Sequence, residues 1–178
     1  VSGGLFGDSK VSATQLHKVL RDSAEDRVAA VQEIISAEPH EPWLVWVNTD
    51  AEQDLIERAL PGIASVRGSD KDKDKEDRLL GFATGKYHSL VTKPKIAGFG
   101  MNWQHCARMV FCGVTYSFEQ MYQAIRRSWR FGQTREVIVY VVTCNAQESI
   151  KSALKAKDEA FKSMAHEMSK YCIQEVSR

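Results

Sequence analysis

The sequence lacks several features that would place it in a special class of protein. No apolar run approaches the roughly 18 residues that a membrane-spanning helix needs. The four cysteines form no Cys-x-x-Cys pair, which argues against a zinc knuckle or a disulfide scaffold. The sequence also has no large excess of charge of one sign, since 24 basic and 23 acidic residues leave a net charge of +1. We therefore expect a cytoplasmic or otherwise intracellular protein with buried thiols and no membrane contact, in which any nucleic acid binds a local basic patch.

The 178 residues suffice for one globular domain that buries its own core. The chain begins with Val1 and has no basic-then-apolar leader, so we interpret it as a piece of a longer protein. Residues 1–8 are rich in glycine and are interpreted as a flexible tail or linker. Residues 9–178 are expected to form a single domain, with a helical lead-in over 9–40, a core over 41–145 and a C-terminal helix over 146–178.

Short apolar runs alternate with helical patterns through the middle of the chain. The runs predict buried strands at 43–47, 63–66, 89–92, 108–111 and 137–142. The helical patterns predict a helix that ends near Pro39, one capped by Asp50, one within 70–85 that turns Leu79, Leu80 and Phe82 inward, and one over about 118–131. This alternation predicts an α/β fold, with a parallel sheet of about five to six strands flanked by helices on both faces and helical additions at both ends.

An arginine-rich segment, Gln-Ala-Ile-Arg-Arg-Ser-Trp-Arg-Phe-Gly-Gln at 123–133, holds three arginines and no acid, with Arg135 just beyond. On a continuous helix, Gln123, Arg127 and Arg130 would share one face. Guanidinium groups without acidic neighbours repel one another unless an anion lies opposite, and their planar shape suits phosphate. The segment therefore favours phosphate binding, with a surface cluster of salt bridges as the alternative.

A glycine-containing loop, Lys-Pro-Lys-Ile-Ala-Gly-Phe-Gly-Met-Asn-Trp at 93–103, directly follows the third predicted strand. Gly98 and Gly100 permit positive φ and close approach of a ligand to the backbone. Ligands of parallel α/β sheets collect at the carboxyl ends of the strands, although a simple tight turn also explains the two glycines. Trp103 is a candidate for stacking on a base, with a place in the core as the alternative.

Taken together, the two segments resemble motifs V and VI of Swi/Snf-type superfamily two helicases and translocases. The usual forms of those motifs are roughly STxAGGxGLN and QAxDRxxRIGQ, and this chain has KIAGFGMN and QAIRRSWRFGQ in the same order. The resemblance extends upstream to the motif IV strand at 43–49 and the glycine turn at 67–69, and covers about Trp43 to Thr143. The residues of these segments are most similar to those of helicases from phages and prophages.

The resemblance implies the second RecA-like lobe, or helicase C-terminal lobe, of an ATP-dependent DNA helicase or translocase. Arg127 and Arg130 would then be catalytic, facing a nucleotide held by the first lobe, with Arg130 as the arginine finger on the γ-phosphate. The positions implied on the nucleotide side are Gln123, Gly98, Gly100 and Asn102. The resemblance places Gly68 near the phosphates of the nucleic acid, and we expect Thr92, Lys93, Lys95 and Trp103 to contact nucleic acid as well. The implied partners are ATP with Mg²⁺, bound mainly by the first lobe of the same polypeptide, and a nucleic acid that we expect to be DNA.

Two positions depart from the family motifs. Arg126 stands where the family has Asp or Gly, and adds a positive charge beside the arginine pair. Pro94 stands where a threonine usually offers its hydroxyl to a DNA phosphate, and Lys93 and Lys95 on either side could replace that contact electrostatically.

A phosphate-binding loop and a magnesium-binding acid are both missing from the sequence. The nearest candidate, 81–87, has one residue too few between its glycines and Tyr87 in place of Ser or Thr. We therefore predict that this lobe is inactive alone. The alternatives are a non-catalytic module of the same fold that binds DNA or protein, and a different α/β enzyme that acts on a phosphate-carrying substrate.

Overall fold

The computed structural model describes residues 13–96, 101–113 and 116–144, and the short pieces 155–156, 159–160, 162–164 and 166–167. The chain divides into two compact units, Ala24–Thr143 and a second unit made of Val1–Ser23 with Cys144–Arg178. In the second unit the structure describes helix α1 (Ala13–Asp22). The expected single domain over 9–178 stays a prediction. Gly98 and Gly100 lie outside the described residues.

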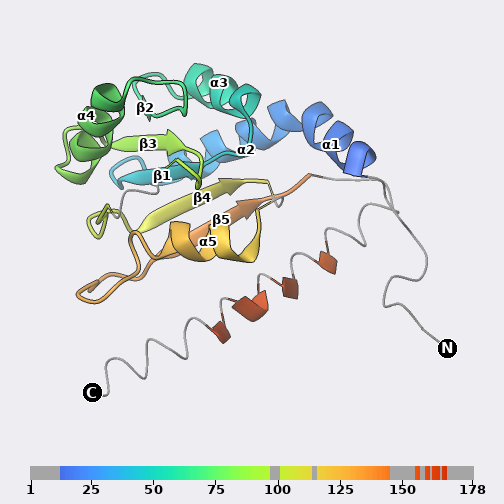
Figure 1. Cartoon of the computed structure of the whole chain (residues 1–178). Helices are drawn as coiled ribbons and strands as arrows, with labels where there is room; N and C mark the ends of the chain where they lie inside the picture. Colours follow the sequence, from blue (N-terminus) through green and yellow to red (C-terminus); the bar gives the residue numbers. More distant parts are fainter. Residues whose placement is uncertain are drawn as a thin grey trace. The chain divides into compact units, whose positions relative to one another are not determined.

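A parallel sheet forms the centre of the Ala24–Thr143 unit (Figure 1). Its described strands are β1 (Trp43–Trp46), β2 (Ala64–Ser65), β3 (Ser89–Thr92), β4 (Arg108–Cys112) and β5 (Ile138–Val142). They lie in the order β2-β3-β1-β4-β5, and every neighbouring pair is parallel. This sheet confirms the predicted parallel α/β fold. The strands could be predicted because strands buried on both faces appear in a sequence as continuous apolar runs.

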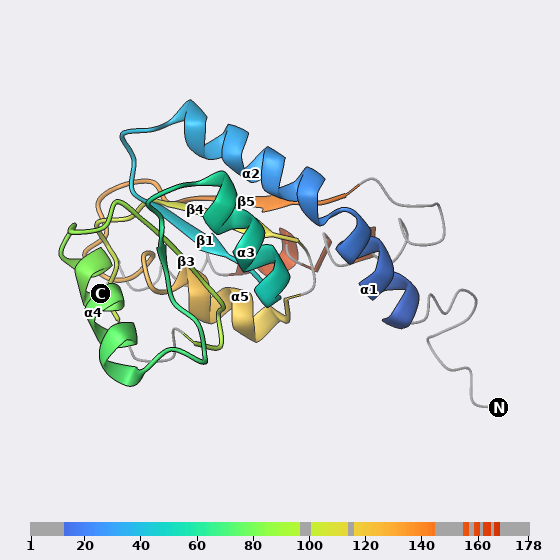
Figure 2. The same ribbon diagram turned by 90° about the horizontal axis from the view of Figure 1, so that it is seen from above.

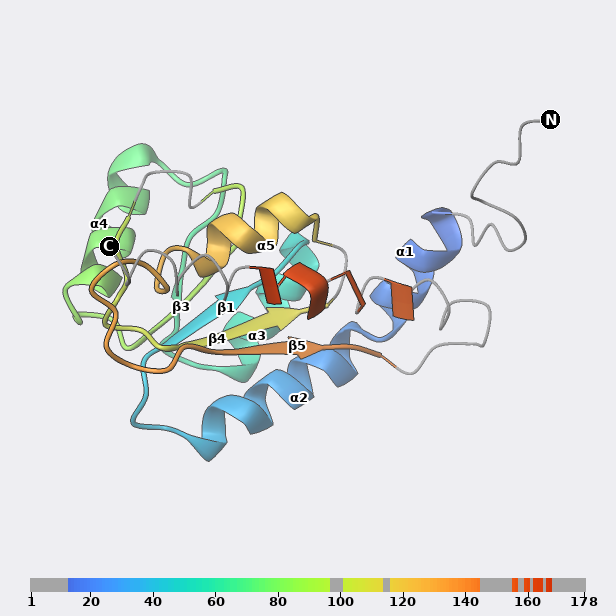
Figure 3. The same cartoon turned by 90° about the horizontal axis from the view of Figure 1, so that it is seen from below.

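Helices cover both faces of this sheet, as the alternation predicted. Helices α2 (Ala24–Ala37) and α3 (Asp50–Ala59) lie on one face, and α5 (Phe118–Ile125) lies on the other (Figures 2 and 3). Helix α4 (Asp72–Ala83) contacts the edge strand β2.

The alternation of side chains along β1 divides the core into two layers. Trp43, Val45 and Val47 belong to the buried cluster on the side of α2 and α3. Trp46 points to the opposite face, where its ring lies 6.1 Å from that of Phe111 and 6.2 Å from that of Trp103. The α5 side of the sheet therefore has an aromatic core.

A buried ion pair ties the two helices of the first face together. Arg27 on α2 donates to the carboxylate of Glu52 on α3, and both side chains are buried. The second oxygen of Glu52 accepts the backbone N–H groups of Asn48 (2.9 Å) and Thr49 (3.1 Å). A single carboxylate thus fixes the loop at the carboxyl end of β1.

Two local predictions are wrong. Thr49, and not Asp50, caps α3, since its hydroxyl accepts the N–H of Glu52 at 3.2 Å in a capping box. Leu80 is 45% exposed, because Leu79 and Phe82 form the inward face of α4 and Leu80 lies off that face by one residue.

Candidate functional site

The arginines of the segment 123–133 lie in a turn rather than on a continuous helix. Helix α5 begins at a capping box on Ser117 and ends at Ile125, with Arg126 as its C-cap. The predicted helix to 131 is therefore wrong, and Arg127 and Arg130 do not share a helix face. Residues 126–133, which we call the arginine turn, follow the helix and carry both side chains.

Two backbone carbonyls just beyond the end of α5 have partners outside any helical pattern. The carbonyl of Arg127 accepts the backbone N–H of Trp103 at 2.9 Å, and that of Ser128 accepts the side-chain amide of Gln133 at 3.0 Å. The terminal carbonyl of α5 itself is satisfied locally, since that of Ile125 accepts the backbone N–H of Trp129 at 2.9 Å. Gln123 stays on α5, where it is exposed.

Positive charge in the arginine turn is uncompensated. Arg127 is half-buried, and this burial lowers the pKa of its guanidinium, with a further lowering from the charge of Arg130. In the part of the chain that the structure describes, neither Arg127 nor Arg130 has a carboxylate within ion-pair distance. Five other arginines each have one: Arg27, Arg67, Arg78, Arg108 and Arg135. Because arginine keeps its charge even when its pKa falls, the turn is suited to hold an anion.

The loop after the glycines lies against this turn. Gln104, two residues further on, donates its side-chain amide to the carbonyl of Phe131 at 2.6 Å. Gln133 donates in return to the carbonyl of Gln104 at 2.8 Å. Sequence reasoning gave neither glutamine a role, and the only signal was that Gln133 closes the Arg-Phe-Gly-Gln motif.

A second group of predicted residues gathers at the carboxyl ends of β2 and β3. A Cβ placed on Gly68 would lie 3.9 Å from the side chain of Ile96, so the glycine turn and the turn over 93–96 are neighbours. Lys93 binds Asp50 at 2.8 Å, and this hydrogen bond lowers the pKa of that carboxyl. Lys95 is exposed and Gly68 is exposed, so both are accessible to a ligand.

The structure corrects the roles expected of Thr92 and Trp103. The hydroxyl of Thr92 is buried and donates to the carbonyl of Val66 at 3.0 Å, which leaves it no reach to a phosphate. Trp103 is fully buried, with its ring 5.5 Å from that of Phe82. A base cannot stack on a ring with no exposed face, so Trp103 belongs to the core.

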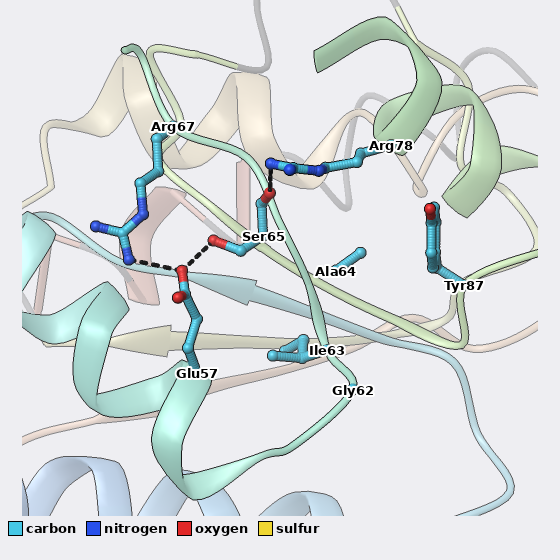
Figure 4. A pocket seen from close by; sticks show the side chains of 8 residues that line it. All are labelled: Glu57, Gly62, Ile63, Ala64, Ser65, Arg67, Arg78 and Tyr87. Carbon is cyan, nitrogen blue, oxygen red and sulfur yellow. Dashed lines mark hydrogen bonds and ion pairs between the residues drawn. The ribbon is translucent and has the colours of Figure 1, made fainter. Parts of the chain in front are cut away.

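A cavity of about 410 Å³ lies beside the edge strand β2 (Figure 4). Its charged lining residues already have partners. Arg67 binds Glu57 at 2.6 Å, and Arg78 binds the carbonyl of Ser65 at 2.8 Å and Asp70 at 2.9 Å. This cavity therefore offers a charged ligand little, and the arginine turn remains the stronger candidate.

The glycine-lysine segment at 81–87 closes a helix instead of opening one. Gly81 lies in α4, and a Cβ there would meet the ring of Tyr87 at 2.6 Å. Phosphate-binding loops present backbone N–H groups at a helix N-terminus, whereas a helix C-terminus presents carbonyls. Among the described residues, no group of three or more His, Cys, Asp or Glu could hold a metal ion, and no helix has the length and apolar character that crossing a bilayer requires.

Solved structures with the same fold include parts of an ATPase, a DEAD-box protein and an RNA-helicase. The chain matches the C-terminal part of the Fun30 ATPase domain with a TM-score of 0.57 and 20% identity, over 79% of this chain and 54% of that one. It matches the C-terminal domain of the DEAD-box protein Dbp5 with a TM-score of 0.56 and 12% identity, over 76% and 78%. The ADP-bound RNA-helicase Prp28 from Chaetomium thermophilum gives a TM-score of 0.58 and 22% identity, over 79% and 35%.

The chain thus spans about half the length of the Fun30 structure and about a third of the Prp28 structure. At these identities the likeness establishes a RecA-like fold. No curated protein sequence matches the chain. The family model of the helicase conserved C-terminal domain matches residues 26–132, which is more than half of the sequence and includes the arginines of the turn. The chain belongs to the helicase conserved C-terminal domain family.

Proposed function

We propose that this chain is the second lobe of a Swi/Snf-type ATP-dependent DNA translocase or helicase, of the kind found in phages, and that Arg127 and Arg130 complete an ATP site on a first lobe. The observation that carries the proposal is the uncompensated charge of the arginine turn. Arg127 and Arg130 lie close enough for the charge of Arg130 to lower the pKa of Arg127, and without a carboxylate between them among the described residues this proximity costs repulsion in the free lobe. An anionic partner across the lobe interface removes that cost.

The two arginines differ in exposure, and this difference supports different roles. Arg130 is exposed and can reach across to a γ-phosphate on the opposite lobe. Arg127 is half-buried, so its guanidinium moves less and neutralises a neighbouring phosphate oxygen. Phosphoryl transfer spreads negative charge over the equatorial oxygens, and a preorganised arginine there contributes roughly 10³- to 10⁵-fold in rate. Bound Mg²⁺, held mainly by the first lobe, would supply further neutralisation of the phosphates.

The carboxyl-end group supplies the surface for nucleic acid in this proposal. Lys95 and Gly68 are exposed, and their turns are neighbours. Lys93 contributes less, because Asp50 compensates its charge. The missing hydroxyl at Pro94 is then replaced by the charge of Lys95, which attracts the phosphate backbone without reading its sequence.

The test is steady-state ATP hydrolysis by the full-length protein that contains this chain, with duplex DNA, RNA or neither. We expect DNA to stimulate hydrolysis, RNA to stimulate it much less, and the isolated chain to be inactive. Equal stimulation by RNA would contradict the choice of DNA. Salt-sensitive DNA binding by the isolated chain, with no hydrolysis even when a P-loop lobe is joined to it, would favour the non-catalytic binding module instead.

A further inference from the structure

Gln133, the last residue of the arginine turn, uses most of its hydrogen-bonding capacity on backbone groups of the turn and its neighbours. Its amide nitrogen donates to the carbonyls of Gln104 (2.8 Å) and Ser128 (3.0 Å), which occupies both of its N–H groups. Its amide oxygen accepts the backbone N–H of Arg135 at 3.0 Å. The side chain thus joins the two ends of the turn to each other and to the loop that contains Gln104.

Gln104 makes the complementary link from the loop side. Asn102 orients it, since the N–H of Gln104 donates to the Asn102 side-chain oxygen at 3.2 Å and the Asn102 amide donates to the Gln104 side-chain oxygen at 3.1 Å. With its side-chain oxygen held in this way, Gln104 donates its side-chain amide nitrogen to the carbonyl of Phe131 at 2.6 Å. It also approaches the carbonyl of Arg130 at 3.4 Å.

These bonds hold backbone groups that the end of α5 leaves without helical partners. Beyond Ile125 the chain has no helix to fix its direction, and the like charges of Arg127 and Arg130 favour spreading of the turn. The carbonyls of Ser128 and Phe131, on either side of Arg130, are each held by one glutamine. The glutamines therefore bracket the residue that the proposed function places on the γ-phosphate.

We propose that Gln104 and Gln133 are positioning residues that hold the backbone of the arginine turn so that Arg130 is presented to phosphate in one geometry. This inference rests on the proposed function, because it assigns the two glutamines to the same site. Neither glutamine need touch the nucleotide. Their contribution is preorganisation, which lowers the free energy needed to align the guanidinium during the reaction.

The experiment replaces each glutamine with methionine in the full-length protein, as Gln133→Met and Gln104→Met. Methionine has nearly the same length and no charge, so each change removes the hydrogen bonds without adding an ion pair. Gln32→Met is the matched control, because Gln32 also donates its amide to a backbone carbonyl, that of Ala59 at 3.0 Å, but between α2 and α3. Melting temperatures identify any variant that fails to fold, and Gln104→Met, at the more accessible site, carries the test if Gln133→Met is unstable.

The expected result is a fall in kcat of about tenfold for both variants, with KM for ATP changed less than about threefold and no effect of Gln32→Met. Single-turnover hydrolysis in an Arg130→Ala background supplies the decisive comparison. If the glutamines act through Arg130, neither variant lowers the rate further in that background. A kcat within twofold of the parent, or the same fold-loss with and without Arg130, would overturn the inference and leave the proposed function standing. If Arg130→Ala alone leaves hydrolysis intact, the proposed function fails and the inference fails with it.

Discussion

The backbone N–H of Trp103 donates to the carbonyl of Arg127 across 2.9 Å. The indole of Trp103 is fully buried against Trp46 and Phe82, so this bond connects the arginine turn to the rigid aromatic core. A residue that appeared from the sequence to be a candidate for contact with a base is instead the anchor of the arginine turn.

A substitution at Gly132 tests whether the activity depends on the backbone conformation of the arginine turn. Its φ of +90° is costly for any other residue, and a Cβ would lie 3.3 Å from the side-chain amide of Gln104. We expect Gly132→Ala to lower the free energy of unfolding by roughly 1–2 kcal/mol and kcat for ATP hydrolysis by roughly three- to tenfold.

Gly62→Ala is the matched control for this change. Gly62 has a nearly identical φ of +91° but open space around the added Cβ. It should show a similar loss of stability in urea denaturation with no loss of kcat. Equal kcat values for the two variants would argue that the geometry of Gln104 is unimportant.

The buried pair between Arg27 and Glu52 gives a prediction about stability. Glu52→Gln leaves the guanidinium of Arg27 buried without its carboxylate, and we expect a loss of about 3–5 kcal/mol in the free energy of unfolding. Asp72→Asn is the control, since it breaks a pair with Lys75 in which the aspartate is fully exposed, and should be silent. Denaturant titration measures both, and a silent Glu52→Gln would show that the loop after β1 does not depend on this carboxylate.

Two buried thiols should resist alkylation in the folded protein. Burial raises the pKa of Cys106 to about 12 and that of Cys112 to about 11, so almost no thiolate forms at pH 8. Because the folded-state pKa values are raised, their contribution to stability is full below about pH 8.5 and declines as the pH rises toward 11. Peptide mapping after iodoacetamide treatment should find both residues labelled in urea but not in buffer, and rapid labelling in buffer would contradict their burial.

Acid should weaken the contact between Glu41 and Arg135. The Arg135 guanidinium donates to both carboxylate oxygens, at 2.6 and 2.5 Å, and lowers the pKa of Glu41. A lowered folded-state pKa gives stability that is present above about pH 4.3 and lost as the pH falls further. Glu41→Gln should therefore reduce the acid dependence of unfolding, whereas Glu76→Gln, at an exposed position of α4, should not. Parallel pH profiles for Glu41→Gln and the parent would contradict this assignment.

The strands were predictable from the sequence because parallel strands are buried on both faces, as the fully buried run over 43–47 illustrates. The end of α5 was not predictable by the same means. Apolar residues such as Trp129 continue the helical spacing past Ile125, while the carbonyls of Arg127 and Ser128 bond to groups that periodicity does not locate. The bond from Trp103 to Arg127 is a tertiary contact just beyond the helix end, and apolar spacing along the sequence does not reveal such a contact.

The candidate site was predictable in part. The absence of acids between 123 and 133 indicated an uncompensated arginine pair, and the structure describes Arg127 and Arg130 without carboxylate partners among its described residues. The glutamines were missed because their role depends on amide bonds to backbone carbonyls, which leave no periodic pattern and no charge signal.

The role of the arginine turn at an ATP site is tested most directly by the rate of DNA-stimulated ATP hydrolysis by full-length protein carrying Arg130→Ala. Arg58→Ala is the control, because Arg58 is an exposed arginine that bonds a carbonyl of its own helix, that of Asp54, at 3.2 Å. We predict a loss of roughly 10³-fold or more for Arg130→Ala and no change for Arg58→Ala. A loss of less than about tenfold for Arg130→Ala would contradict the assignment of the arginine turn to the ATP site.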